Sequence, residues 1–162
     1  MRRRLVLYPD AVLSAASQPV GSLTAKEHEL IERMIETMVA ERGVGLAACQ
    51  VGVAKRIFVA APEGRRGEVL VVVNPVVTAE EGEVLSAEGC LSLPGVSCEV
   101  RRAQSLELEG LDPHGRQMRR RVDGFLARIV QHEVDHLAGK LIIDRVGYQE
   151  RTALLASLAK RP

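Results

Sequence analysis

The segment Gln131-His132-Glu133-Val134-Asp135-His136-Leu137 carries the most informative pattern of this sequence, His-Glu-x-x-His. Two histidines at positions i and i+4 of a helix share one face, about one turn apart, so both imidazoles can reach one cation. The glutamate beside the first histidine lies close enough to a metal-bound water to take its proton and return it to a leaving amine. A bound metal lowers the pKa of water from ~15.7 towards ~7, so the motif predicts a hydrolytic metal site.

The residues on either side of the motif predict the helix that the motif requires. We expect a helix from about Gly124 to Leu137, with Asp123 as its N-cap and Gly139 at its stop. The alternative interpretation is a solvated helix face that carries two unrelated histidines. Two of the chain's four histidines lie in this one motif, which favours metal binding over that alternative.

A catalytic metal site needs three protein ligands and an open position, so one ligand has still to be found. One zinc-protease pattern places a third histidine six residues after the second, where this chain has Ile142. Another pattern uses a glutamate on a following helix, but Asp144 and Glu150 lie too close to the motif and no acidic residue follows them. The third ligand must therefore come from upstream.

Cys90, within Glu88-Gly89-Cys90-Leu91-Ser92-Leu93-Pro94, is the best candidate for this ligand. Gly89 lets the backbone approach a metal closely, and Pro94 stiffens the exit of the loop. Cys49 and Cys98 are the alternatives, but small buried cysteines are often core residues, and we favour that role for both. A Cys-His-His set suits Fe(II) or Zn(II) without choosing between them.

Two further helices and several short strands are expected around this motif. Thr24 and Glu27 form a capping box at the start of a helix from about Thr24 to Arg42, and Gly43 suits its stop. A C-terminal helix is expected over residues 148–160. Strands are expected at residues 56–61, 69–73 and 76–77, the last two separated by Asn74-Pro75, and as short strands with tight turns within 84–108, with a turn at 112–115.

This order of elements predicts an α+β fold. We expect short, mainly antiparallel strands around a central helix that carries His-Glu-x-x-His, with an N-terminal and a C-terminal helix. Because no repeat, low-complexity tract or linker interrupts the sequence, residues 1–162 are expected to form a single catalytic metallohydrolase domain.

Composition and charge exclude several other classes of protein. Hydrophobic residues make up 46% and charged residues 27% of the chain, which is typical of globular proteins. The net charge of +1 gives no electrostatic reason to bind nucleic acid or an anionic membrane. No apolar stretch approaches the ~20 residues that span a bilayer, and Pro9 and Asp10 interrupt the apolar run that follows the basic start. With three cysteines in no disulfide pattern, we expect a cytoplasmic protein.

Three blocks of the sequence, in their order and spacing, closely resemble the peptide deformylases. They are Gly43-Val44-Gly45-Leu46-Ala47-Ala48-Cys49-Gln50, Glu88-Gly89-Cys90-Leu91-Ser92, and the His-Glu-x-x-His segment. Weaker similarity extends from Tyr8-Pro9-Asp10 to Asp144-Arg145. The resemblance implies removal of the formyl group from N-formylmethionyl nascent polypeptides, with release of formate, during maturation of new proteins. It also implies Fe(II) as the natural metal, with Zn(II), Ni(II) or Co(II) as substitutes.

The resemblance also implies a role for individual residues. The metal ligands become Cys90, His132 and His136, which is the set already reached from coordination chemistry, and Glu133 becomes the general acid and base. The side-chain amide of Gln50 and the backbone N–H of Leu91 become the pair that stabilises the oxyanion, a contribution of ~3 kcal/mol for one donor.

The resemblance further implies how a substrate would lie. The backbone around Gly45 and Gly89 would pair with an extended peptide, and the small residues from Gly43 onward would leave room for a formyl group. The methionine pocket would include Val44 and the helix face of Phe125 and Ile129, for which ordinary core packing is the alternative. The partners are then formylmethionyl peptides or nascent chains.

Three further details concern residues outside the three ligands. Cys49 stands where the family usually has Pro or Thr, which places an extra thiol near the site. Arg102 and Asp135 are candidates for a supporting pair behind the ligands, but we expect an ordinary surface pair. The tail that ends Lys160-Arg161-Pro162 is expected to pack on its own domain, with a contact to the ribosome as the alternative.

Two other functions remain open from the sequence. A metallopeptidase would also use His-Glu-x-x-His, although its usual third ligand is missing here. A structural or interaction protein could use the metal only to hold the fold together, but it would need neither Glu133 nor Gln50.

Overall fold

The computed structural model describes residues 4–64 and 67–160 of the chain, and its elements confirm the α+β expectation. In this part of the chain the helices are α1 (Ala25–Ala40), α2 (Gly124–Leu137) and α3 (Tyr148–Ala159), with 3-10 turns at Ala11–Ser14, Ala48–Val51 and Ile142–Asp144. The strands are β1 (Gly45–Ala47), β2 (Ile57–Ala60), β3 (Leu70–Glu81), β4 (Val84–Cys90), β5 (Leu93–Arg102), β6 (Ser105–Leu111) and β7 (Gln117–Asp123).

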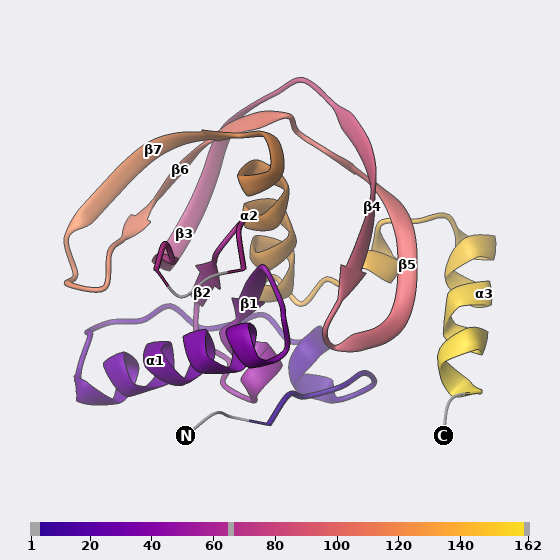
Figure 1. Ribbon diagram of the computed structural model, residues 1–162, viewed down its shortest axis with the longest axis horizontal. Coiled ribbons are helices and arrows are strands. Elements are labelled where there is room, and N and C mark those ends of the chain that lie inside the picture. The colour runs from indigo at the N-terminus through magenta and orange to yellow at the C-terminus, as the bar shows by residue number, and fades with distance from the viewer. Residues whose placement is uncertain (1–3, 65–66, 161–162) are drawn as a thin grey trace.

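The strands form two antiparallel sheets. One sheet has the order β1-β2-β3-β6-β7, and β4 pairs with β5 in a separate long hairpin. Figure 1 shows α2 between these two sheets, with the β4–β5 hairpin arching beside it and α1 across the lower side of the molecule. The helix α2 therefore lies between the two sheets, and within the described residues one edge of β1 and one edge of β4 carry no strand partner.

The five-stranded sheet separates two apolar layers. Along β2 the side chains alternate, so Phe58 and Ala60 face the core that contains α2, whereas Ile57 and Val59 face the core that contains α1. All four are fully buried. This alternation fixes the register of the sheet, because a slip of one residue would exchange the two faces. The sheet thus holds α2 rigidly on one of its faces.

The capping box predicted at the start of α1 is present. The hydroxyl of Thr24 accepts a hydrogen bond from the backbone of Lys26 at 3.3 Å, and the backbone N–H of Thr24 donates to the carboxylate of Glu27 at 2.9 Å. Lys55 also pairs with Glu27. Hydrogen bonds from Lys55 and Thr24 lower the pKa of Glu27 to about 2.

We expect Thr24→Ala to destabilise the protein by about 1 kcal/mol, because it removes the hydroxyl that caps α1. Thr24→Ser keeps the hydroxyl and should stay within a few tenths of a kcal/mol of the original chain. Urea unfolding followed by circular dichroism measures both. Equal stability of the Ala and Ser variants would contradict this role of the cap.

The end of α1 differs from the expectation. The residue that adopts the left-handed conformation is Arg42, with φ 55°, and not Gly43. The backbone N–H of Gly43 donates to the carbonyl of Met38 at 2.9 Å, which closes the helix. A different constraint explains the glycine, since a Cβ at position 43 would lie 2.8 Å from the side chain of Leu91. Gly139 does end α2 as expected, with φ 73°.

Strand β3 also differs from the expectation, because Asn74-Pro75 does not end it. The register of β3 against β6 shifts between Val73 and Val76, so the proline lies at an irregularity within one strand. The Asn74 side chain accepts a hydrogen bond from the backbone of Val20 at 2.8 Å and donates one back at 2.9 Å. A partner distant in sequence therefore holds the bulge in place.

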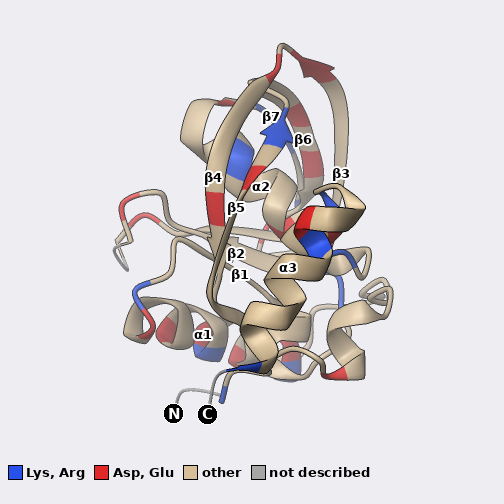
Figure 2. Ribbon diagram, turned by 90° about the vertical axis from the view of Figure 1, so that its right-hand side faces the viewer, with Lys and Arg blue, Asp and Glu red and all other residues tan. Residues whose placement is uncertain are grey.

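The C-terminal helix α3 lies against β5 at the edge of the molecule (Figure 1). Leu154, Leu155 and Leu158 pack against the core that contains α2, in agreement with the expected packing of the tail on its own domain. Residues 161–162 lie outside the described part, as does the basic start at residues 1–3. No described helix is both long and apolar enough to cross a membrane. In the ribbon of Figure 2, positions of acidic and basic residues are interspersed over the elements.

Candidate metal centre and active site

Three potential metal ligands converge from two elements. Cys90 ends β4, and His132 and His136 lie one turn apart on α2. The Cys90 Sγ lies 3.3 Å from His136 Nε2, which lies 3.2 Å from His132 Nε2. One ligand atom from each residue falls within 4.8 Å of the others. The structure therefore brings together the three residues that the sequence singled out.

The orientation of these groups fits a metal ion. Nδ1 of His132 lies 3.0 Å from a carboxylate oxygen of Glu88, so in the neutral imidazole that binds metal this nitrogen would carry the proton and Nε2 would present its lone pair to the cluster. A thiolate and two imidazole nitrogens that point at a common centre are donors that suit Fe(II) or Zn(II). Glu133 Oε2 is buried without a hydrogen-bond partner, which leaves it available to a group bound beside the cluster.

The other two cysteines are outside this group. The Cys49 Sγ donates to the backbone carbonyl of His136 at 3.6 Å, and the Cys98 Sγ donates to the carbonyl of Ile142 at 3.8 Å. Both side chains belong to the core that contains α2. Burial, followed by the nearby Glu133 and Cys90, raises the pKa of the Cys49 thiol to about 12. The preferred core role of both residues agrees with this placement.

The pKa values of Glu133, His136 and His132 shift in different directions. Burial raises the pKa of Glu133 to about 7, although the charge of His132 opposes this shift. Burial also lowers the pKa of His136 well below its usual value, helped by the nearby His132. For His132 burial acts in the same direction, but hydrogen bonds with Cys90 and Glu88 outweigh it and raise the pKa. A carboxyl group with a pKa near 7 can both take and return a proton at neutral pH.

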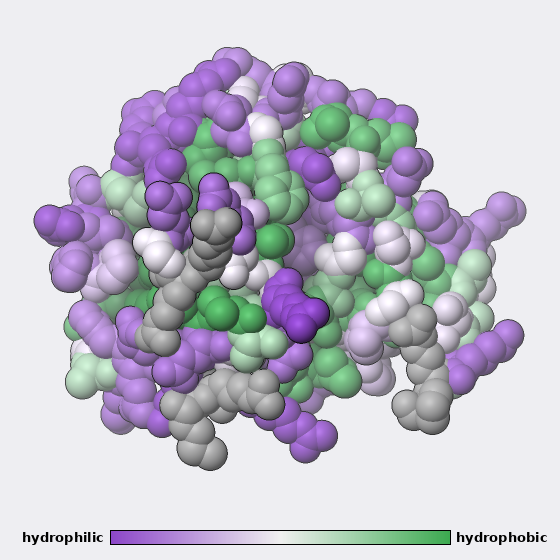
Figure 3. Space-filling view, in the orientation of Figure 1, coloured by the Kyte–Doolittle hydropathy of each residue, from purple (hydrophilic) through white to green (hydrophobic). Residues whose placement is uncertain are grey.

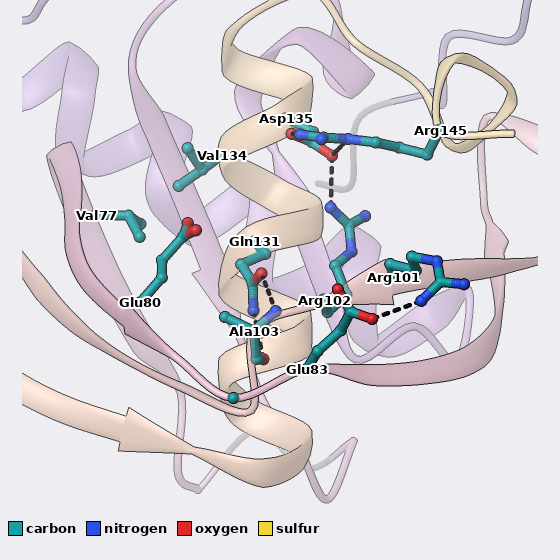
Figure 4. A pocket seen from close by; sticks show the side chains of 11 residues that line it. Val77, Glu80, Glu83, Arg101, Arg102, Ala103, Gln131, Val134, Asp135 and Arg145 are labelled. Carbon is teal, nitrogen blue, oxygen red and sulfur yellow. Dashed lines mark hydrogen bonds and ion pairs between the residues drawn. The ribbon is translucent and has the colours of Figure 1, made fainter.

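A buried network of charged side chains orients His132 through its contact with Glu88. The guanidinium of Arg102 donates two hydrogen bonds of 2.9 Å to Glu88. It donates a third, of 2.6 Å, to Asp135, which also pairs with Arg145, as Figure 4 shows. The Arg102 side chain is only 2% exposed. Although burial opposes it, the pairing with Arg102 and His132 lowers the pKa of Glu88 to about 2.

The expectation of a surface pair between Arg102 and Asp135 was therefore wrong. Both side chains are buried, and Arg102 on β5 bonds directly to Asp135 on α2 and, through Glu88, is linked to His132, a candidate metal ligand. A polar pocket of about 430 Å³ lies on the other side of α2, where Arg101 and Arg145 reach the surface beside this network (Figure 4).

Gln50 is held with its amide NH₂ toward the cluster. Its Oε1 accepts a hydrogen bond from the backbone N–H of Ala47 at 2.9 Å, which fixes the orientation of the amide. Its Nε2 donates to the Ser92 hydroxyl at 3.2 Å and lies 3.6 Å from the Cys90 Sγ. A preorganised donor of this kind can stabilise negative charge that develops on a nearby oxygen.

A groove of about 610 Å³ leads to the cluster between the free edges of β1 and β4. Figure 3, in the orientation of Figure 1, shows hydrophobic side chains exposed among hydrophilic ones near the middle of this face. His136 lies in the cluster but does not line the groove. Every other predicted site residue lines it, namely Gly43, Val44, Gly45, Gln50, Gly89, Cys90, Leu91, Phe125, Ile129, His132 and Glu133.

Sequence reasoning missed two residues of this site. Glu88 lies in one of the three blocks but had no predicted role, and Ser92, which accepts from Gln50, had none either. The available signal for Glu88 was its position two residues before Cys90, because alternate residues of a strand face the same side. Nothing comparable pointed to Ser92, whose contact depends on how two distant segments pack.

The class of protein follows from these features. An α+β fold that places a His-Glu-x-x-His helix beside a thiol, with a buried carboxylate and an oriented amide at the end of a groove, is typical of small hydrolases that act through a metal ion.

Comparisons with known proteins give the particular family. The family model for polypeptide deformylase matches residues 2–152. The peptide deformylase of Thermodesulfovibrio yellowstonii is 42% identical over 146 residues, covering 89% of this chain and 88% of that protein. The crystal structure of a peptide deformylase from Legionella pneumophila matches with a TM-score of 0.94 and 36% identity over 100% of both chains. That from Thermus thermophilus matches with a TM-score of 0.89 and 43% identity, covering 97% of this chain and 93% of that one. The chain belongs to the polypeptide deformylase family.

Proposed function

We propose that this protein hydrolyses the formyl group from N-formylmethionyl peptides and nascent chains, releasing formate. Family membership over most of the chain supports this proposal, and so does the convergence of Cys90, His132 and His136 beside Glu133 and Gln50. The reaction breaks the C–N bond of the formamide, forms a C–O bond with water and returns a proton to the leaving amine.

In this proposal the thiolate of Cys90 and the two Nε2 atoms hold one divalent metal, natively Fe(II), for which Zn(II), Ni(II) or Co(II) can substitute. The ion supplies Lewis acidity, which lowers the pKa of a water molecule towards ~7. Glu133 takes a proton from the attacking water and delivers it to the amine nitrogen. The amide of Gln50 and the backbone N–H of Leu91 donate to the formyl oxygen as negative charge develops there.

The substrate would lie extended in the groove, with its backbone between the free edges of β1 at Gly45 and β4 at Gly89. The methionine side chain would then enter the part of the groove formed by Val44, Phe125 and Ile129. We place the enzyme in the cytoplasm, where nascent chains at the ribosome supply this substrate.

The decisive experiment measures formate release from a formyl-Met peptide after anaerobic loading of the protein with Fe(II). Release that a chelator abolishes and Fe(II) restores would support the proposal. Cleavage of internal peptide bonds without formate release would indicate a metallopeptidase instead. A metal that cannot exchange and is needed only for folding would indicate a structural site.

We expect Gly45→Ala to lower kcat/KM for a formyl-Met peptide by about 10²-fold, because small misplacements of a catalytic group have effects of this size. A Cβ at position 45 would collide with the Glu133 carboxylate and would lie 2.8 Å from Ile129 Cγ2. Gly21→Ala is the matched control, since no heavy atom lies within 4 Å of a Cβ there. Unchanged kinetics in Gly45→Ala would show that Glu133 does not depend on this close approach.

A further inference from the structure

Two arginines line the groove away from the candidate metal ligands. Arg42 is exposed and directly precedes Gly43 on the β1 side. Arg128 lies on α2, one turn before His132, and its Nη2 donates to the backbone carbonyl of Ala87 at 3.3 Å. Its guanidinium carbon lies 5.3 Å from the centre of the Phe125 ring. Arg128 thus joins α2 to β4 across one wall of the groove.

Both arginines line the groove beside the segments that lead to the cluster. Arg42 precedes Gly45 by three residues, and Ala87, which holds Arg128, precedes Cys90 by three residues. With a rise of ~3.3 Å per residue along β4, Ala87 lies about 10 Å from Cys90, whereas Arg42 reaches the groove from the turn between α1 and β1. A peptide whose formyl group is at the cluster and whose backbone follows these two edges would therefore bring its second and third residues to the two arginines.

The acidic residues that line the groove do not neutralise this end of it. Glu88 is already paired with Arg102 and with His132, and Glu133 lies at the reactive end. Glu41, beside Arg42, also lines the groove and takes part in an interaction, but one carboxylate does not balance two guanidinium groups. Two guanidinium groups therefore face the part of the groove through which the peptide would leave.

We propose that Arg42 and Arg128 make the groove selective for formylmethionyl peptides with Asp or Glu at the second or third residue. This inference rests on the proposed deformylase function and specifies its substrate class. A guanidinium forms charge-assisted hydrogen bonds with a carboxylate, and an exposed pair of this kind changes affinity about two- to fivefold. Because the charges lie away from the reacting atoms, the effect is on KM rather than kcat.

The test compares kcat/KM of the Fe(II)-loaded enzyme on amidated formyl-Met peptides. Formyl-Met-Ala-Ser is the neutral reference, and single Glu or Lys substitutions are placed at its second or third residue. We expect Glu peptides to exceed the reference by about two- to fivefold, Lys peptides to fall below it, and both differences to shrink at high salt. Equal rates for all peptides, or a preference for Lys, would overturn the inference and leave the deformylase function intact. Absence of formate from the neutral peptide would instead contradict the function itself.

Substitutions assign the preference to the two residues. Arg42→Gln and Arg128→Gln should each lower the ratio of the Glu rate to the neutral rate, whereas Arg120→Gln, an exposed arginine on β7 outside the groove, should leave the ratio unchanged. A ratio that persists in both groove variants would overturn the assignment. If a variant fails to fold, the comparison of peptides on the unaltered enzyme still tests the proposed preference for acidic residues.

Discussion

The Glu133→Gln variant is expected to lose at least 10²-fold, and up to about 10⁴-fold, of its deformylase kcat, because positioned general acid–base groups contribute rate enhancements of this size. Burial already raises the pKa of the Glu133 carboxyl to about 7, which suits a group that must accept and then release a proton. Glutamine has nearly the same shape but cannot carry that proton. Formate release under anaerobic Fe(II) loading measures the loss.

The metal content of the variant shows whether activity is lost because the general base is absent or because the metal ion no longer binds. The predicted ligands are Cys90, His132 and His136, so Glu133→Gln should still bind one metal ion per chain by elemental analysis. Glu99→Gln is the control, because Glu99 is exposed on β5 and does not line the groove. Full activity in Glu133→Gln would eliminate this residue as the base. Loss of the metal along with activity would point to a role in binding rather than in proton transfer.

The features that the sequence predicted best are those that depend on residues close together in the chain. The helix α2 was predicted with its bounds, because the helical pattern and the glycine at its end lie within a short segment, although the side chain of Asp123 at the predicted N-cap makes no capping hydrogen bond. Cys90 could be reached by elimination, since a metal site needs a third ligand and no suitable residue follows the motif. In both cases the chemistry of a few neighbouring residues was sufficient.

What the sequence could not predict depends on partners distant in the chain. Strand β7 contains Arg119, Arg120 and Arg121, a polar run that gave no strand signal. It forms a strand because its residues pair with β6, where Arg119 lies near Glu107 at 3.4 Å, while Arg121 reaches Glu81 at 2.7 Å. The burial of Arg102 likewise depends on Glu88 and Asp135, partners 14 and 33 residues away in the chain, and no local pattern predicts it.

The Arg102→Met variant is expected to lose about 3–5 kcal/mol of stability, because it leaves Glu88 and Asp135 buried without their shared partner. For a chain of this length the thermal midpoint should fall by roughly 10–15 °C. Arg101→Met is the matched control, since Arg101 is 69% exposed and pairs with Glu83, which is 62% exposed. An exposed pair contributes at most about 1 kcal/mol, so this neighbour should barely change the midpoint.

A second substitution tests whether unpaired charge is the cause of the loss. Adding Glu88→Gln to Arg102→Met removes one of the two carboxylates that lose Arg102, of which, among the described residues, Glu88 keeps only His132 and Asp135 only Arg145, so we expect part of the lost stability to return. Each change also loosens the support of His132, and metal affinity should therefore stay about 10–100-fold below that of the original chain. Recovery of stability without recovery of affinity would separate the two roles of the network. If the double variant were less stable than Arg102→Met alone, the Arg102 side chain would stabilise the fold by its packing and not by its charge.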